Sequence, residues 1–413
     1  MRKSLSFILI LTVVFTSLLI GGCQTTPTTP AAKTPAATQP TTPPPALPPI
    51  KIGHLRPLTG HQAQTGERMV RGFAFALEQA GFEVAGRKIE VLVEDDGSKP
   101  ETAVDKARKL VENDKVAMIV GPTAGGSQMA VSAYLDKVGI PMLTTNPSPP
   151  GIIMQKHKWT ILTAGPYTLI SSSMGRYAYE QMNIKKVDIM TADWAGGHGF
   201  LDAYMGTWKK LGGEIVQEQY PPLGTGDYGP YLANLKDADA LVAWFDGAEA
   251  IKFLSQYTDF GMWKRLPIVA AFHGSFFAPY IIAQLPPTAA QAIVGRITPT
   301  PYSSLLDIPA NKDFVAKFKS KYNFTPEDTE SGPYQGALIA LAGLKATNGD
   351  TTPAKLLEAM LNVQIDGPEG PIKIDKEKKS VIKNIYICKV DKQGNEYIWV
   401  PVYTYKDVPP LGF

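Results

Sequence analysis

Short apolar segments alternate with helix-length amphipathic segments from residue 50 onward. Both faces of each short segment are largely apolar, as in strands that are buried in a parallel sheet. This pattern predicts four strands, at Ile50–Arg56, Lys88–Glu94, Ala117–Gly121 and Ile140–Leu143. Because helix-length segments separate the strands, crossover helices are expected to join them, which predicts a doubly wound α/β sheet.

Two of the intervening segments carry specific helix signals. Ser98 and Glu101 have the spacing of a capping box, and Pro100 stands in the first turn of the predicted helix. In the next segment apolar residues repeat at helical spacing until Gly139, which is placed as a helix terminator. Both segments are therefore predicted to be helices that cover the sheet.

The alternation of apolar and amphipathic segments starts again after the fourth strand. It predicts six further strands, at Trp159–Thr163, Val187–Thr191, Glu214–Glu218, Ala240–Trp244, Ile268–Ala271 and Ile293–Thr298. Two successive α/β halves of similar size indicate two lobes with a cleft between them.

The C-terminal region does not continue this alternation of apolar and amphipathic segments. We predict helices over Asn311–Tyr322 and Tyr334–Ala346. Alternating polar and apolar residues then predict a hairpin of Asn384–Val390 and Glu396–Tyr403, with its turn at Asp391–Asn395.

The N-terminal residues predict export rather than a folded element. A basic leader precedes an apolar run that ends in Ile20-Gly21-Gly22-Cys23. That ending resembles a bacterial lipobox, so we expect residues 1–22 to be a lipoprotein signal peptide and Cys23 to be lipidated. The alternative is an uncleaved membrane anchor. The rest of residues 23–49 is rich in Thr, Pro and Ala, which predicts an extended spacer.

Composition limits the remaining chemistry. The chain has 41 Lys and Arg residues against 38 Asp and Glu residues, which does not indicate a nucleic-acid-binding surface. Its two cysteines, Cys23 and Cys388, exclude a disulfide framework, and the apolar neighbours of Cys388 predict a buried thiol. Common catalytic motifs and metal-ligand spacings of histidine are absent from the sequence, so we expect no enzyme, metal or cofactor.

Five short stretches occur in a characteristic order: Ile52–Gly60, Glu94–Asp96, Val120–Pro122, Gly139–Pro141 and Asp193–Gly197. Together they resemble the branched-chain-amino-acid-type solute-binding proteins of ABC importers, over residues 50 to about 405. This resemblance implies the type I periplasmic-binding-protein fold, in which a three-strand hinge joins two doubly wound parallel-sheet lobes around a ligand cleft.

The resemblance also implies a domain division and partners. It assigns residues 50–164 and 297–366 to the first lobe, and residues 165–296 and 367–413 to the second. It implies a small-molecule solute as ligand, permease and ATPase subunits of an ABC importer as partners, and an extracytoplasmic location. We expect a monomer that is held at the membrane by its lipid anchor.

The loop that contains Gly125, Gly126 and Ser127 ends a predicted strand and opens a predicted helix. Its glycines let backbone N–H groups approach a ligand, Ser127 adds a hydroxyl, and a helix N-terminus favours a carboxylate. The next strand leads to Asn146 and Ser148 at the same sheet edge. The resemblance implies that Gly125, Asn146 and Ser148 hold the ligand carboxylate, although Gly125 replaces a serine of the leucine/isoleucine/valine-binding protein.

The resemblance places three other ligand-contacting positions around the cleft. Thr65 stands where the family often has an aromatic residue. Trp194 and Gly196 are expected on the opposite side, where Trp194 can cover an apolar or aromatic ligand group. Two alternatives stay open: Trp194 packs into the lobe surface, and the neighbouring Asp193 caps a helix.

Two departures from the family pattern bear on the ligand's identity. His273 stands where amino-acid binders present a carboxylate to the ligand ammonium, and Asp246 replaces a tyrosine of the leucine/isoleucine/valine-binding protein. Asp246 therefore either receives the ammonium or orients His273 toward a ligand that has no amine. Each residue could instead be a loop-capping or surface group.

These expectations favour one function over two others. We expect capture of a small carboxylate-bearing solute by hinge closure, followed by delivery to the permease. The solute is a branched-chain or other amino acid, a related amide, or an aromatic acid. The alternatives are a receptor that signals through a membrane partner and a periplasmic hydrolase.

Overall fold

The structure is a computed structural model that describes residues 47–60, 62–149, 156–272, 276–410 and 412. The predicted signal peptide, Cys23 and nearly all of the spacer lie outside these residues, as does His273. The expectations for them therefore stay predictions.

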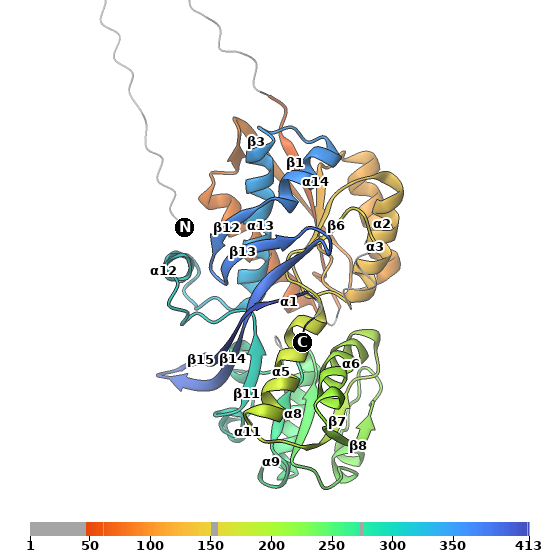
Figure 1. The fold of residues 1–413 in the computed structure, drawn as a ribbon, viewed down its shortest axis with the longest axis vertical. Helices are drawn as coiled ribbons and strands as arrows, with labels where there is room; N and C mark the ends of the chain where they lie inside the picture. The colour runs from red at the N-terminus through yellow and green to blue at the C-terminus, as the bar shows by residue number, and fades with distance from the viewer. Residues whose placement is uncertain (1–46, 61, 150–155, 273–275, 411, 413) are drawn as a thin grey trace, which may run out of the picture. The chain divides into compact units, whose positions relative to one another are not determined.

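The first sheet is built on parallel strands (Figure 1). Strand β1 pairs in parallel with β3 on one side and with β4 on the other, and β5 and β6 continue the sheet. A short strand, β2, pairs antiparallel with β3. The bounds are Ile50–Arg56 (β1), Glu83–Val84 (β2), Arg87–Asp95 (β3), Met118–Val120 (β4), Met142–Thr144 (β5) and Thr160–Leu162 (β6). The predicted doubly wound parallel sheet is confirmed.

Helices cover both faces of this sheet because alternate residues of its strands point to opposite sides. In β4, Met118 and Val120 join a hydrophobic core that includes α1 and α13, whereas Ile119 joins a second core with α2 and α3. The helices are α1 (Ala63–Gln79), α2 (Pro100–Arg108, continued by a π-helical turn, Lys109–Asn113), α3 (Gly125–Val138), α13 (Asp328–Ala346) and α14 (Pro353–Leu361).

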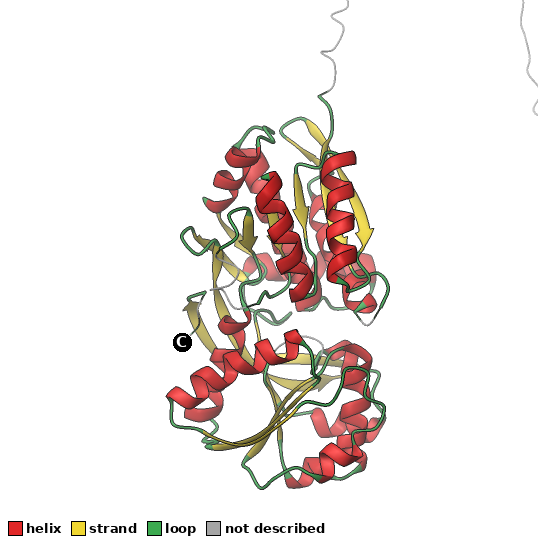
Figure 2. Ribbon diagram, turned by 90° about the vertical axis from the view of Figure 1, so that its right-hand side faces the viewer, coloured by secondary structure: helices red, strands yellow, loops and turns green. Residues whose placement is uncertain are grey.

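The second sheet has four parallel strands in the order β10-β9-β7-β8. Figure 2 shows helices around this sheet as well. The strands are β7 (Lys186–Thr191), β8 (Glu214–Gln219), β9 (Ala240–Trp244) and β10 (Ile268–Ala270). The helices are α5 (Tyr167–Glu180), α6 (Ala195–Lys210), α7 (Gly229–Ala233), α8 (Gly247–Asp259), α9 (Met262–Arg265), α10 (Pro279–Ile282) and α11 (Pro287–Ile293).

The C-terminal strands extend the first sheet. Strand β14 (Ser380–Gln393) pairs with β13 (Gly370–Asp375) and β6 near its start, and farther along with β11 (Ile297–Thr300) and β15 (Glu396–Val408). Strand β12 (Gln364–Gly367) forms a hairpin with β13. The expected lobe boundary between residues 366 and 367 therefore falls inside a hairpin of the first sheet, and the division into lobes stays a prediction.

Several local predictions need correction. Helix α2 has no side-chain cap, because Ser98 adopts a left-handed φ of 61° and donates its N–H to the Asp96 carboxylate. The strand expected from Ile293 begins only at Ile297, since α11 occupies the preceding residues.

The helices and hairpin of the C-terminal region are longer than predicted. Helix α12 (Pro309–Tyr322) begins two residues before the predicted start at Asn311. Helix α13 begins at Asp328 rather than Tyr334, with a capping box of Glu327 and Glu330. Strand β14 starts before the predicted residue and continues into the predicted turn, which leaves only residues 394 and 395 as the turn. Strand β15 begins at Glu396, as predicted, and continues beyond Tyr403 to Val408.

Two other predictions are confirmed. Gly139 ends α3 in the left-handed conformation, with φ 73°. Cys388 is fully buried, and this burial raises the pKa of its thiol.

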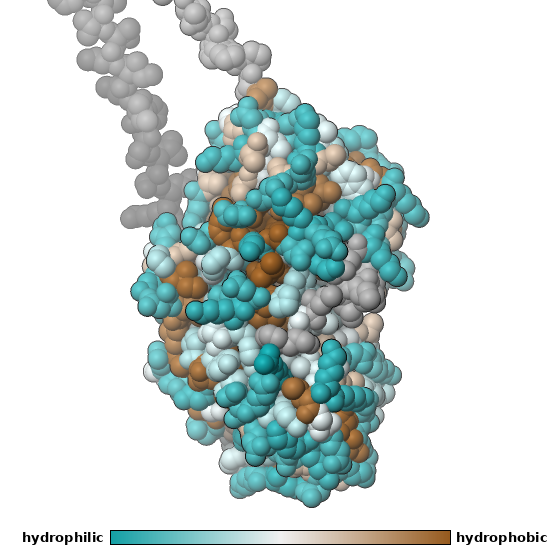
Figure 3. All heavy atoms as spheres, viewed as in Figure 1, coloured by the Kyte–Doolittle hydropathy of each residue, from teal (hydrophilic) through white to brown (hydrophobic). Residues whose placement is uncertain are grey.

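Figure 3 shows polar residues over most of one face of the described chain, with small apolar patches between them. Among the described residues, no helix combines the length and the hydrophobicity that a membrane span requires.

Candidate functional site

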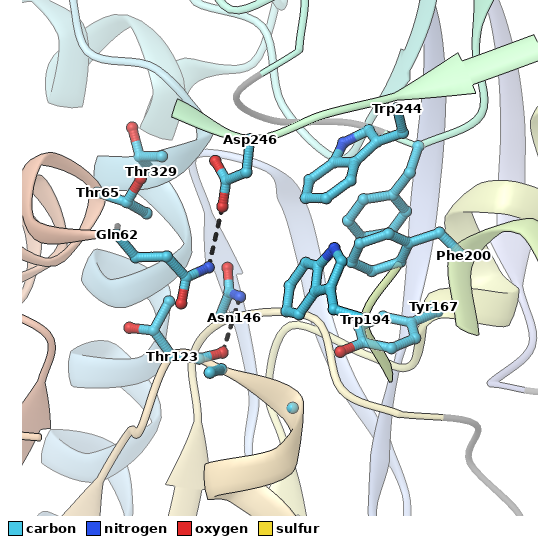
Figure 4. A pocket seen from close by; sticks show the side chains of 13 residues that line it. Gln62, Thr65, Thr123, Asn146, Tyr167, Trp194, Phe200, Trp244, Asp246 and Thr329 are labelled. Carbon is cyan, nitrogen blue, oxygen red and sulfur yellow. Dashed lines mark hydrogen bonds between the residues drawn. The ribbon is translucent and has the colours of Figure 1, made fainter. Parts of the chain in front are cut away.

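The carboxyl ends of strands from both sheets contribute to one pocket (Figure 4). Parallel strands all end at the same sheet edge, where ligands of open α/β sheets bind. The space between the atoms that line the pocket is about 460 Å³, part of it open to solvent. Its lining consists of Gln62, Thr65, Thr123, Ala124, Gly125, Asn146, Tyr167, Trp194, Phe200, Trp244, Asp246, Phe272 and Thr329.

The wall that the first sheet supplies is polar. Thr123 follows β4, and its carbonyl oxygen accepts a hydrogen bond of 3.1 Å from the amide of Asn146, which follows β5. The buried amide of Gln128 also donates to the Thr123 carbonyl, at 3.2 Å. These bonds fix the loop whose next residues open α3, so its hydroxyl and backbone groups hold a constant position.

The wall that the second sheet supplies is aromatic, and five rings form it. Trp194 stacks on Trp244 with ring centres 6.0 Å apart, while Phe200 and Phe272 stack at 4.0 Å. Tyr167 packs edge-on against Phe200 at 4.3 Å. Trp194 is the least buried of the five, which makes it the ring that presents most surface to a ligand. The stacking on Trp244 shows that Trp194 is part of this cluster.

Tyr167 explains why residue 125 is a glycine. A Cβ atom at residue 125 would lie only 2.3 Å from the Tyr167 hydroxyl oxygen, so no larger residue fits there without movement. The Tyr167 hydroxyl thus occupies the place that a side chain at residue 125 would take. Burial raises the pKa of Tyr167, so its phenol stays protonated at neutral pH and can donate a hydrogen bond.

Asp246 is the acidic residue of the described pocket lining. Its Oδ2 accepts a hydrogen bond of 2.9 Å from the Gln62 amide, which belongs to the opposite wall. Its Oδ1 is buried and has no hydrogen-bond partner among the described residues. Asp246 precedes α8 but makes no side-chain cap, so the loop-capping alternative is wrong. A buried carboxylate oxygen without a donor is unfavourable until a ligand supplies one.

The structure brings together half of the ten predicted ligand-binding residues. Thr65, Gly125, Asn146, Trp194 and Asp246 line the pocket.

Four other predicted residues lie beside the pocket rather than in it. Gly126 and Gly196 line a neighbouring hollow. Ser127 and Ser148 are fully buried, and the Ser148 hydroxyl donates to Thr144 at 3.0 Å. The tenth predicted residue, His273, lies outside the described residues. The ligand-binding roles of all ten stay predictions.

Asp193 does not cap the helix that follows it. The N-cap of α6 is Trp194, and no side chain caps this helix. Asp193 instead pairs with the imidazole of His198 at 2.8 Å. The described residues contain no cluster of potential metal ligands.

Sequence reasoning missed most of the aromatic wall. Trp244 ends β9, and Phe272 follows the end of β10, so their positions carried a usable signal. Phe200 lies inside α6 and Tyr167 opens α5, and nothing local in the sequence links them to the cleft.

Comparison with known proteins agrees with this geometry. The sequence model of a family described as periplasmic binding protein matches residues 49–395. The chain belongs to the periplasmic binding protein family. Its architecture is the type I fold, as the resemblance implied. Membership of this family implies an extracytoplasmic location.

Curated relatives of this periplasmic binding protein are named for amino acids. Leu/Ile/Val-binding protein homolog 6 of Brucella melitensis is 26% identical over 83% of this chain and 88% of its own. The leucine-, isoleucine-, valine-, threonine-, and alanine-binding protein of Pseudomonas aeruginosa is 25% identical over 81% and 87%.

Similar solved structures include aromatic-acid complexes. A solute-binding protein of an ABC transporter from Rhodopseudomonas palustris BisB5, in complex with 3,4-dihydroxybenzoic acid, is 28% identical with a TM-score of 0.80. The similarity covers 87% of this chain and 98% of that protein. A second, from strain HaA2 with p-hydroxybenzoic acid, is 25% identical with a TM-score of 0.80, over 87% and 98% of the two chains.

The contact between Gly125 and Tyr167 generates a test. Gly125→Ser should destabilise the protein by about 1–3 kcal/mol, because its Cβ would overlap the tyrosine hydroxyl. Adding Tyr167→Phe should restore part of the loss, since it removes the overlapping oxygen but leaves the Pro149 ring, whose Cγ would lie 3.0 Å from the Cβ. Gly126→Ser is the matched control, because a Cβ there meets its nearest neighbour at 3.5 Å. Chemical denaturation measures the four proteins, and equal stability of the two serine variants would contradict the steric account.

Proposed function

We propose that this protein is the solute-binding component of an ABC importer and that it captures a small aromatic carboxylate. The observation that carries the proposal is the division of the pocket into a polar wall at the start of α3 and an aromatic wall of five rings. An aromatic acid has the same division, with a charged group at one end and a flat apolar body.

The polar wall suits the carboxylate. Thr123, Gly125 and Asn146 surround the first turn of α3, where unpaired backbone N–H groups and the helix dipole favour an anion. Asn146 uses one amide proton on the Thr123 carbonyl and has a second that can reach a ligand. On binding, the ligand carboxylate would exchange its hydrogen bonds to water for hydrogen bonds to these fixed donors.

The aromatic wall suits a ring. Trp194 and Trp244 present stacked indoles, and an offset-stacked ring gains about 0.5–1.5 kcal/mol beyond the apolar area that it buries. Two similar structures, 28% and 25% identical to this chain, are complexes with hydroxylated benzoic acids. In such a ligand, a ring hydroxyl could donate to the unpaired Oδ1 of Asp246.

An amino acid is the second candidate, and Asp246 is the observation that favours it. An ammonium group would also satisfy the buried Oδ1 and would add an opposite charge. Curated relatives are named for leucine, isoleucine and valine. The aromatic wall then favours a large apolar or aromatic side chain.

Capture would occur by closure of the two walls on the solute. The hydrogen bond between Gln62 and Asp246 already joins the walls, and a ligand that contacts both would add to it. We further propose that lipidated Cys23 holds the protein at the membrane, where it delivers solute to the permease. Signalling through a membrane partner remains the alternative. Binding without turnover implies that a bound acid is recovered intact after long incubation.

Calorimetric titration of the purified protein tests the ligand class. We expect 4-hydroxybenzoate to bind with micromolar affinity, about 8 kcal/mol, and L-leucine to bind at least tenfold more weakly. L-Phenylalanine offers both a ring and an ammonium, so its affinity is compared with that of 4-hydroxybenzoate. Weaker binding of L-phenylalanine favours the aromatic acid, and tighter binding favours the amino acid. Tighter binding of L-leucine than of either ring compound would contradict the aromatic-acid proposal.

Asp246→Asn tests which ligand group donates a hydrogen bond to the side-chain carboxylate of Asp246. If Asp246 accepts a ring hydroxyl, the variant should bind 4-hydroxybenzoate about tenfold or more weakly, because a hydrogen bond to a charged group is lost, while benzoate affinity stays the same. An ammonium ligand would instead lose most of its affinity for the variant. Unchanged affinity for every ligand would show that Asp246 does not contact ligand.

Trp194→Ala tests the aromatic wall. We expect roughly a tenfold or greater loss of 4-hydroxybenzoate affinity, because the ring that presents most surface to the pocket is removed. Trp263, which is half-buried and does not line the pocket, provides the matched control as Trp263→Ala. Equal affinities of the two variants, measured by calorimetry, would remove Trp194 from the site.

A further inference from the structure

A fully buried arginine lies directly behind the polar wall of the pocket. Arg56 ends β1, and its side chain has no solvent exposure. Its Nη1 donates to the hydroxyl of Thr123 at 3.2 Å, and its Nη2 donates to the hydroxyl of Thr145. Thr123 lines the pocket, so this one residue lies between the guanidinium and the ligand space.

The partners of this cation are neutral. Its Nε donates to the Nε2 of His54 at 2.8 Å, and Nη1 also approaches the sulfur of Met69 at 3.7 Å. His54 is itself buried, and burial, together with the adjacent Arg56, holds the pKa of its imidazole well below the usual value. The histidine therefore accepts the hydrogen bond in its neutral form and adds no charge.

No described carboxylate forms an ion pair with Arg56. Asp96 is the carboxylate whose charge acts on Arg56 without direct pairing: its Oδ1 accepts the Ser98 N–H, and its buried Oδ2 has no hydrogen-bond partner among the described residues. Burial lowers the pKa of Arg56 to about 9, so the side chain still carries its charge at neutral pH. A desolvated guanidinium whose direct hydrogen-bond partners are all neutral is costly to bury.

The pocket itself offers no other cation among its described lining residues, which are neutral apart from Asp246. Among the described residues, two arginines contact lining residues from behind the wall: Arg56 at Thr123, and Arg68, which is already paired with two glutamates, at Thr329. The Thr123 hydroxyl can connect Arg56 to a ligand carboxylate, because it accepts from Arg56 while its own proton faces only the weak acceptor sulfur of Met69, at 3.4 Å.

We propose that Arg56 is a specificity-determining residue that selects an anionic ligand group, acting through the hydroxyl of Thr123. The inference rests on the proposed function for the position of the carboxylate, but not on the aromatic body of the ligand. In this account the ligand carboxylate supplies a second negative charge, on the side of Arg56 that Thr123 contacts.

The test compares an acid with its neutral amide. Affinities for 4-hydroxybenzoate and 4-hydroxybenzamide are measured on the wild-type protein, Arg56→Met and Arg56→Lys. We expect the wild-type preference for the acid to fall roughly tenfold or more in Arg56→Met, through weaker binding of the acid alone, and to persist largely in Arg56→Lys. Equal weakening of acid and amide would mean a merely structural role and would overturn the proposal, as would no change in either.

Thr123→Val is a second variant that keeps the test decisive if Arg56→Met does not fold. It removes the connecting hydroxyl but leaves Arg56 in place, and the account predicts the same selective loss of acid binding. A variant that keeps the wild-type preference for the acid would overturn the proposal.

If the wild-type protein binds neither 4-hydroxybenzoate nor 4-hydroxybenzamide, the proposal of an aromatic ligand is wrong, but the inference about Arg56 is still open to test. In that case thermal unfolding is followed in sodium acetate and in sodium chloride of equal ionic strength. Acetate should raise the midpoint over that in chloride by more in the wild-type protein and in Arg56→Lys than in Arg56→Met, which reports the non-specific effect of the salt. The absence of an acetate-specific shift in the wild-type protein would overturn the proposal.

Discussion

Most of this pocket depends on one constraint, that all strands of a parallel sheet end at the same edge. The ends of β1, β4 and β5 meet there, which brings together Arg56, Thr123 and Asn146 from distant parts of the chain. The ends of β7, β9 and β10 do the same in the second sheet for Trp194 and its neighbours. A single pocket can therefore draw on six chain segments without any of them being long.

The two walls differ in chemistry, so each suits a different part of a ligand. The first wall holds hydroxyls, amides and a helix start in front of a buried guanidinium, which suits a charged group. The second holds stacked rings, which suit a flat apolar body and contribute area rather than charge. Asp246 and Gln62 connect the walls, and the unpaired oxygen of Asp246 leaves one acceptor for a ligand. Selectivity in this account comes from a few buried groups and not from the net charge of the protein.

Much of the fold could be predicted because the strands are buried on both faces, so their apolar runs stand out. Strands β1 and β9 begin and end at the predicted residues. The pocket residues Asn146 and Asp246 could be found for a related reason, since each follows a strand end. Helix ends were less predictable, because several local groups compete for the same hydrogen bonds. At α2, for example, the Asp96 carboxylate accepts the Ser98 N–H, and the expected side-chain cap does not form.

The rest of the site depends on tertiary contacts that no local pattern encodes. Phe200 and Tyr167 reach the pocket because α5 and α6 pack on each other, and Gly125 is explained only once the Tyr167 hydroxyl is seen beside it. Ser127 and Ser148 have suitable hydroxyls and lie close in sequence to the pocket, but the fold buries both. The direction of a side chain at a strand end is set by the elements packed around it.

The most direct measurement is mass spectrometry of the small molecule that the protein retains when it is purified without added ligand. The account predicts a mass and fragmentation pattern of an aromatic monocarboxylate. A sugar, a simple cation or an aliphatic amino acid in the same experiment would contradict it.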